Sequence, residues 1–465
     1  MTTGTIQIQA KRPALPLLEP RFAALKKSLV KPEHREKVEE SYGRLCRVLA
    51  SDAEFIRKTG PAMVPEIDFN SLFDETSSQG PAELPPAFAD LVRERGCVVL
   101  RNVVPEAQAT AWEAELIEYT RTHPNVGGFP VEDPQNWSLW WTRPQVQIRS
   151  HPRVLAAMAC VSRLWHVADP SLPVDLGAQV MYPDRFRIRH PSPNEAYTLP
   201  AHLDSGAIER WEDPANRANF AAIFEGNWQD WDGWEAGGRI HAASDLYSVE
   251  AACTCWRSLQ GWLSLSHTNT GEGTLRLLPN LKASVAYCML RPLFGNSFAE
   301  KEGTIDDSQP TFPGSTPGCT QFFPTRDHHP HLDLDKSMIG IPPVRPGDYV
   351  FWHCDLVHEV DRFHPGTTNS SVVYNACSPL TPYNIDSLVG NRAAFAQAMP
   401  PPDFELSEYG REQECDHADH GARQENVLCK EGLQALGLAP FDANAPGLTE
   451  GEREIRRLAN EKLGF

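Results

Sequence analysis

The strand-rich stretch from about residue 175 to residue 380 constrains the fold more than any other part of this 465-residue chain. Short segments of alternating character recur there between Gly, Pro and Asn turns, among them RFRIR (185–189), GWLSLS (261–266) and SVVYNAC (371–377). Strands this short and this closely spaced favour a closed or sandwiched antiparallel sheet over a doubly wound parallel sheet. The sequence therefore predicts a mainly β core.

Helical patterns flank this core on both sides. Residues 20–60 show helical periodicity with charged faces, and helical patterns return from about residue 386. We therefore expect an N-terminal helical extension (1–60), a core (61–385) with an insertion around 207–250, and a C-terminal helical extension (386–465) that packs on the core. Helices on the outside of a β core are compatible with one elaborated domain.

Composition limits which binding partners and which cellular compartment we expect for this chain. A formal net charge of −18 argues against a broad binding surface for nucleic acid or an anionic membrane. The 11 cysteines form no paired framework, which favours reduced thiols in the cytosol. The N-terminal segment MTTGTIQIQAKRPALP lacks the apolar region of a secretory signal, and no apolar run reaches membrane-spanning length. We expect a soluble, cytoplasmic protein.

The tripeptide His-x-Asp occurs four times and raises the question of a metal site. The four copies are His202/Asp204, His331/Asp333, His353/Asp355 and His417/Asp419. On a strand, residues i and i+2 face the same way, so each pair can supply two neighbouring ligands. A histidine from a remote strand would complete the 2-His-1-carboxylate set that suits non-haem Fe(II). Any single copy is weak evidence, because a hydrogen-bonded polar pair looks the same in sequence.

Position in the chain separates the four copies. Only His202/Asp204 is followed, after several intervening strands, by a histidine-bearing strand in VRPGDYVFWHCDLVHEVDRF (344–363). The second copy lies in DHHPHLDLDK, which is typical of a polar surface loop, and the fourth lies beyond the strand-rich region in CDHADHG, where we expect a solvated loop. The third copy shares the predicted strand with His358, and we expect its histidine to be structural.

Four segments in this order resemble a known family. Along the chain they are GCVVLRNVVPEAQA, AHLDSG, QGWLSLSHTNTGEGTLRLLP, and the turn, strand and histidine of residues 344–363. Together they look like the corresponding segments of Fe(II)/2-oxoglutarate-dependent oxygenases of the phytanoyl-CoA-dioxygenase-like type. The longer context, with LDSGAIERW, NWQDWDGWEAGGR and YCMLRPLF, is most similar to the YbiU-like branch, a domain of unknown function. The resemblance covers roughly residues 65 to 400.

The resemblance implies a fold, a ligand set and a reaction. The fold would be a double-stranded β-helix (jelly roll), with Fe(II) held by His202, Asp204 and His358, which stands ten residues past Asp348. The co-substrates would be 2-oxoglutarate and O2, and the reaction would hydroxylate a small molecule with release of succinate and CO2. His353 is then expected to be a packed, hydrogen-bonded residue, and His364 a turn residue.

The chain departs from the family pattern where the distal carboxylate of 2-oxoglutarate should bind. Relatives carry an arginine shortly after the distal histidine, whereas no Lys or Arg lies between Arg362 and Arg392 here. Arg276, with Thr274 as a hydroxyl partner on the same strand face, is the first candidate to replace it. A surface-facing Arg276 is an equally weighted alternative. Arg187 and Arg189 are the reserves.

Two other questions stay open from the sequence. Trp228, Trp231 and Trp234 recur every three residues and could form a substrate wall, although packing of the insertion is the favoured interpretation. The alternatives to an oxygenase are a cupin-type metalloenzyme that does not use 2-oxoglutarate and a non-catalytic jelly-roll binding protein. Three intact candidate ligands weigh against the second alternative.

Overall fold

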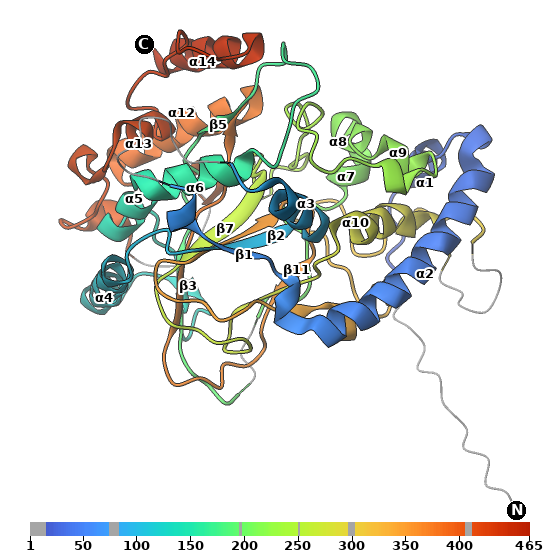
Figure 1. Cartoon of the computed structure of the whole chain (residues 1–465), viewed down its shortest axis with the longest axis horizontal. Coiled ribbons are helices and arrows are strands. Elements are labelled where there is room, and N and C mark those ends of the chain that lie inside the picture. Colours follow the sequence, from blue (N-terminus) through green and yellow to red (C-terminus); the bar gives the residue numbers. More distant parts are fainter. Residues whose placement is uncertain (1–14, 74–82, 195–197, 250–251, 296–302, 405–411) are drawn as a thin grey trace, which may run out of the picture.

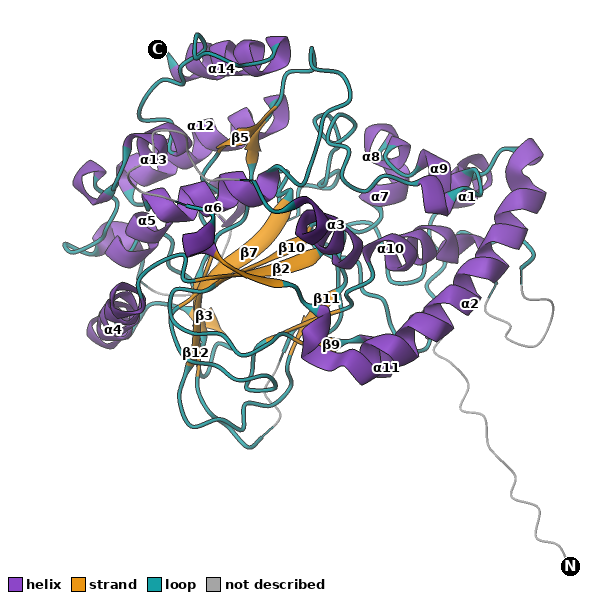
Figure 2. Cartoon of the chain, viewed as in Figure 1, coloured by secondary structure: helices purple, strands orange, loops and turns teal. Residues whose placement is uncertain are grey.

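A central layer of strands surrounded by helices forms the molecule (Figures 1 and 2). The computed structural model describes residues 15–73, 83–194, 198–249, 252–295, 303–404 and 412–465, so the first 14 residues of the predicted N-terminal extension lie outside it. Within these residues, helix is more abundant than strand. The expected β core with flanking helices is present, but the chain is mixed rather than mainly β, because the extensions and the insertion fold largely into helices.

The strands are β1 (Glu66–Asp68), β2 (Cys97–Arg101), β3 (Gly128–Phe129), β4 (Asn136–Trp137), β5 (Asp175–Gln179), β6 (Phe186–Arg189), β7 (Leu259–Ser264), β8 (Leu275–Leu277), β9 (Ile339–Gly340), β10 (Tyr349–His353), β11 (His358–Val360), β12 (Ser370–Tyr374) and β13 (Pro379–Leu380). The α-helices are α1 (Arg21–Leu29), α2 (Arg35–Thr59), α3 (Pro86–Arg95), α4 (Glu106–Thr122), α5 (Arg143–Arg149), α6 (Pro152–Ser162), α7 (Glu209–Glu212), α8 (Pro214–Ala218), α9 (Ala221–Phe224), α10 (Leu281–Leu290), α11 (Leu334–Ser337), α12 (Pro382–Gln397), α13 (Lys430–Ala435) and α14 (Glu450–Leu463).

Eight strands form one sheet in the order β1-β2-β10-β7-β12-β6-β4-β3. Only the β1–β2 pairing is parallel, and the other pairings in this sheet are antiparallel. A smaller antiparallel sheet has the order β11-β8-β9, and β13 pairs with β5. Every residue of β7 and β10 is buried. This burial explains the near-continuous apolar sequence of β10, because both faces of the strand are covered.

Helices from the two ends of the chain cover different sides of the strands. On one side, α2 packs against α10 and α11, and on the other side α12 packs against α14, which also contacts β5 (Figure 1). Gly96 ends α3 with a left-handed φ of 75° and leads directly into β2. Pro105 stands immediately before α4 as its N-terminal capping residue.

The predicted strand over residues 348–357 is interrupted, which corrects one expectation. His353 is the last residue of β10 in the large sheet, whereas His358 is the first residue of β11 in the small sheet. A turn separates them, in which the Asp355 amide donates to His353 Nδ1 at 3.0 Å and the Leu356 amide donates to the His353 carbonyl at 2.9 Å. The two histidines therefore belong to different sheets and different surroundings.

No helix among the residues that the structure describes is both long and apolar enough to span a bilayer.

Candidate metal centre and its pocket

Backbone pairing brings His202 and His358 side by side. The His202 amide donates to the His358 carbonyl at 2.9 Å, and the His358 amide donates to the His202 carbonyl at 3.1 Å. Leu203, the next residue, pairs with Phe322 in the same two-way manner. The strand-like segment at His202 is therefore fixed between two other parts of the chain. Alternation then directs the side chains of His202 and Asp204 to one side.

The chain turns sharply just after Asp204. Ser205 and Gly206 have positive φ values of 64° and 84°. A Cβ atom at Gly206 would lie 2.4 Å from the Ser244 carbonyl oxygen, so only glycine fits there without a shift of backbone. This turn ends the segment of residues 202–204, called the ligand segment below, and leads the chain into α7 and the insertion.

The ring nitrogens of both histidines are oriented by backbone carbonyls. His202 Nδ1 lies 2.7 Å from the Pro200 carbonyl oxygen, and His358 Nδ1 lies 3.0 Å from the Leu356 carbonyl oxygen. A carbonyl can only accept a hydrogen bond, so each Nδ1 carries the proton and each Nε2 keeps a free lone pair. This is the outer-shell arrangement that orients metal-binding histidines.

The free Nε2 atoms face the Asp204 carboxylate. His202 Nε2 lies 3.5 Å from Oδ1 of Asp204, and His358 Nε2 lies 3.7 Å from Oδ2. These three residues form one of the groups of side chains in the described structure that could hold a metal ion. The residues fit Fe(II), because two imidazoles and one carboxylate are the ligand set of non-haem iron sites.

Burial sets the charge state of this site. It lowers the pKa of His202 to about 3, aided by the neighbouring His358, so His202 is neutral at physiological pH. Burial alone would raise the pKa of Asp204, but the neighbouring His358 and His202 rings and the Arg257 guanidinium outweigh it and hold that pKa well below its usual range. Neutral imidazole and ionised carboxylate are the forms that bind a metal.

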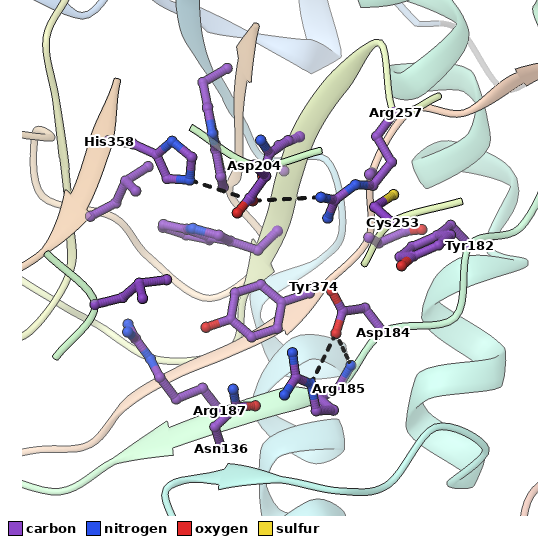
Figure 3. A pocket seen from close by; sticks show the side chains of 18 of the residues that line it. Asn136, Tyr182, Asp184, Arg185, Arg187, Asp204, Cys253, Arg257, His358 and Tyr374 are labelled. Carbon is purple, nitrogen blue, oxygen red and sulfur yellow. Dashed lines mark hydrogen bonds and ion pairs between the residues drawn. The ribbon is translucent and has the colours of Figure 1, made fainter. Parts of the chain in front are cut away.

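A cavity of about 180 Å³ opens beside the three residues. Its polar lining includes Arg185, Arg187, Arg257, Tyr182 and Tyr374. Figure 3 shows His358 and Asp204 pointing toward each other near Arg257, with Arg187 across the pocket and Tyr374 between them in this view. A pocket with a metal-binding face and several guanidinium groups is suited to a small anionic ligand.

The structure does not bring Arg276 and Thr274 to this pocket. The residue between them, Leu275, lines the cavity instead. Arg276 donates to the Met338 carbonyl at 2.7 Å and lies 3.3 Å from Glu359. The Thr274 amide donates to Asp361 at 3.1 Å. Because side chains alternate along a strand, Leu275 in the pocket places both neighbours on the opposite face of β8.

The two reserve arginines lie on β6, which pairs with β12. Arg187 is opposite Val372 and Arg189 is opposite Ser370. Arg187 lines the pocket, donates to the Gly273 carbonyl at 3.1 Å, and has a buried Nε with no hydrogen-bond partner among the described residues. Arg189 is buried and donates to the carbonyls of Asp361 and Arg362. Of these two arginines, only Arg187 lines the pocket, and its free Nε is a donor that a ligand there could use.

Two further residues at the site have no distinctive signal in the sequence. Gln321 donates to Oδ1 of Asp204 at 2.6 Å, and the Arg257 guanidinium lies 3.6 Å from Oδ2. Both residues stand in segments without a recognisable motif. The three tryptophans of the insertion are buried and do not line the pocket. Trp231 and Trp234 donate to the carbonyls of Asn219 and Arg93, which supports the packing interpretation.

The other histidines near the site have different environments. His353 is fully buried, its Nε2 lies 2.9 Å from the Gly233 carbonyl, and its ring stacks on Trp165 with centroids 4.8 Å apart. The prediction of a packed, hydrogen-bonded histidine is confirmed there. His364 is buried, and its backbone forms a bridge with Ser192. The His331 ring packs edge-on against Tyr287, 5.6 Å between centroids.

Comparison with known proteins assigns the chain to a family. A model of the Gig2-like family matches residues 16–438. The chain belongs to the Gig2-like family. The crystal structure of GlcNAc Inducible Gene 2, GIG2 (DUF1479), from Candida albicans is 36% identical, covers 97% of this chain and 96% of that chain, and superposes with a TM-score of 0.87.

The bacterial relatives are less similar in sequence to this chain. The uncharacterized protein YbiU of Escherichia coli (strain K12) is 29% identical over 350 residues, which is 71% of this chain and 79% of that protein. The crystal structure of the hypothetical protein JW0805 from Escherichia coli is 25% identical, covers 90% of this chain and 96% of that chain, and has a TM-score of 0.74. The predicted resemblance to YbiU-like proteins is thereby confirmed.

Proposed function

We propose that this Gig2-like protein is an Fe(II)- and 2-oxoglutarate-dependent oxygenase that hydroxylates a small molecule. The observation that carries the proposal is the convergence of two free Nε2 atoms, from His202 and His358, on the Asp204 carboxylate. Each histidine has its other nitrogen held by a backbone carbonyl. Such a set has the donors for one metal ion and leaves the remaining positions open for co-substrates.

The arrangement of strands is consistent with the double-stranded β-helix that the proposal requires. The large and small sheets are antiparallel apart from one edge pairing, and the His202–His358 bridge connects the ligand segment to β11 of the small sheet. The residue range between the two histidines spans β7 to β10, so the third ligand returns from a remote strand. We infer that these strands are an elaborated form of that fold.

We further propose that Arg187 binds the distal carboxylate of 2-oxoglutarate. The arginine that relatives carry after the distal histidine would fall near β12, and Arg187 lies directly opposite Val372 of that strand. A guanidinium on the adjacent strand can therefore serve the same part of the pocket. Its unpartnered Nε provides the donor that a carboxylate would accept from, and such charge-assisted bonds are strong and directional.

The remaining residues would orient the site and exclude water. Iron bound with 2-oxoglutarate and dioxygen would supply decarboxylation to succinate and CO2 together with hydroxylation of the substrate. Gln321 fixes one oxygen of the Asp204 carboxylate, and Arg257 balances the charge of the other. The apolar rings of Trp262 and Trp352 line the same cavity and would limit water near the metal.

An anaerobic spectroscopic titration tests this function. Fe(II) added to the purified protein with 2-oxoglutarate should give the weak visible charge-transfer band of a chelated complex, and air should then yield succinate. A protein that binds Fe(II) but gives neither band nor succinate would instead favour a cupin-type metalloenzyme. A protein that binds no divalent metal at His202, Asp204 and His358 would contradict both assignments and favour a binding protein.

A further inference from the structure

The fourth His-x-Asp tripeptide, His417/Asp419, is not the solvated loop that its sequence indicates. His417 is only 2% exposed. It lies beside the end of α4, where His123 is the C-terminal capping residue. Glu412 joins them, because its backbone forms a parallel bridge with Val126. Two parts of the chain that are nearly 300 residues apart in sequence therefore meet at one place, outside the pocket described above.

The loop that carries His417 is anchored by its own backbone and by a buried carboxylate. Glu414 accepts hydrogen bonds from the amides of Trp140 and Trp141 at 2.7 and 2.9 Å. The His417 amide donates to the Glu414 carbonyl at 3.0 Å. A loop held in this way keeps its side chains in defined positions, which a ligand-binding site requires.

Two imidazoles converge on one carboxylate here, with their far nitrogens held by other groups. His417 Nε2 lies 3.4 Å and His123 Nδ1 lies 3.9 Å from Oε1 of Glu412. On the opposite edges of the rings, His417 Nδ1 lies 2.6 Å from the Tyr119 hydroxyl and His123 Nε2 lies 2.9 Å from Asp419. Outer partners of this kind orient histidines that bind metals.

One ring nitrogen of His417 is buried and free to bind a ligand. His417 Nε2 is buried and has no hydrogen-bond partner among the residues that the structure describes, although it faces Glu412. Buried polar atoms are rarely left in this state. The site also lies at the C-terminal end of the 17-residue α4, where the helix dipole favours a positive charge.

We propose that His123, Glu412 and His417 bind a divalent transition-metal ion, with Zn²⁺ as the best match. Two imidazole nitrogens and one carboxylate oxygen suit this ion, and water would complete a tetrahedron. The His123 and His417 rings are stacked in the structure, with centroids 3.7 Å apart and planes inclined by 14°. The His123 ring must therefore tilt to share one ion, which its partial exposure permits.

The ion would fasten the segment 412–419 to the end of α4. Because the ligands come from two parts of the chain that are nearly 300 residues apart, the folded chain binds the ion more tightly than the unfolded chain does. Binding of this kind raises the melting temperature in proportion to the logarithm of the free ion concentration. The role is structural, and it is independent of the oxygenase proposal because the two groups share no residue.

Zinc counting with a chromophoric chelator tests the site. In a His358→Ala chain, which lacks a ligand at the pocket, we expect one tightly bound Zn²⁺ to remain and to raise the melting temperature by roughly 2–5 °C at saturating zinc. Adding Glu412→Gln, His123→Gln or His417→Gln should weaken that binding by at least about 10-fold. His331→Gln, in the unused second tripeptide, is the matched control and should leave it unchanged.

Two results would overturn this proposal. The first is a folded His358→Ala chain that binds no Zn²⁺ at micromolar concentration. The second is unchanged zinc binding in both Glu412→Gln and His123→Gln, whose partly exposed side chains can be replaced without disturbing the buried His417. A parallel count in the wild-type chain reports the pocket site separately, so failure of one site leaves the assignment of the other intact.

Discussion

The tripeptides His202/Asp204 and His353/Asp355 are both well buried, yet their surroundings give them opposite properties. In His353/Asp355, both ring nitrogens have hydrogen-bond partners, and the carboxylate pairs with Arg210 and Arg239. In the first tripeptide, His202 keeps a free Nε2, and the nearest guanidinium is 3.6 Å from the Asp204 carboxylate. A buried histidine with both ring nitrogens in hydrogen bonds stabilises a core, whereas one with a free lone pair can bind a ligand.

Replacing the aspartate by alanine should lower stability in the His353/Asp355 tripeptide and weaken metal binding in the His202/Asp204 tripeptide. Asp355→Ala leaves Arg210 and Arg239 as unpaired buried charges, and breaking such a pair should lower the free energy of unfolding by about 3–5 kcal/mol. Denaturant unfolding of the metal-free protein measures this loss. A decrease below about 1 kcal/mol would mean that water reaches the two arginines, and the contrast with Asp204 would weaken.

Asp204→Ala should leave the fold intact and remove the metal. Loss of one of three ligands should weaken Fe(II) binding by about 100- to 1,000-fold, more than the 10- to 100-fold effect typical of an outer-shell partner. Isothermal titration with Fe(II) or Mn(II) under anaerobic conditions measures the change. His353→Ala is the control, since that side chain has no free nitrogen to offer. Equal metal loss in both variants would contradict the assignment of ligands.

Arg187→Ala should weaken 2-oxoglutarate binding without changing metal content. Removal of a charge-assisted bidentate contact in a partly buried site should cost about 2–4 kcal/mol, or roughly 30- to 1,000-fold in affinity. The dependence of the charge-transfer band on 2-oxoglutarate concentration gives the affinity. Arg276→Ala is the matched control on the far face of β8 and should change it less than about 2-fold. A reversal of these two results would show that the inferred role of Arg187 is wrong.

The smallest expected effect is in the pH dependence of stability. Burial lowers the pKa of His353 to about 4 from 6.5. Between these values the unfolded chain binds more protons than the folded chain, so the free energy of unfolding falls as pH drops from 6.5 toward 4. One such group contributes up to about 1.4 kcal/mol per pH unit. His353→Gln should reduce the slope of the free energy of unfolding against pH by that amount. An unchanged slope would show that another group takes up the proton.

Local sequence patterns predicted the strands and the candidate ligands better than they predicted their surroundings. Alternation identified the segments that became β6, β7, β10 and β12, because burial on a pleated strand is a local property. The same alternation failed on β8, which has three residues. With so short a strand, nothing local decides which face is inside, and Leu275 rather than Arg276 lines the pocket.

Long-range partners account for most of what the sequence could not predict. The break between His353 and His358 depends on Asp355, whose two arginines come from the insertion. Arg187 was a reserve candidate because only strand pairing puts it opposite Val372. Likewise, His417 looks solvated in sequence, because its neighbours Tyr119 and His123 come from a helix nearly 300 residues away. Each of these contacts is set by topology and not by spacing.

Arg210 physically joins the two tripeptides compared above. One of its nitrogens pairs with the Asp355 carboxylate, and the other donates to the backbone carbonyl of Asp204 at 2.7 Å. Arg210 thus holds residue 204 through its main chain, whereas Gln321 and Arg257 contact its side chain. The hydrogen bond from Arg210 that positions residue 204 therefore does not depend on which side chain that residue carries. A designer could exchange that carboxylate for a small side chain, keep the loop in position, and offer the vacated coordination position to an external anion.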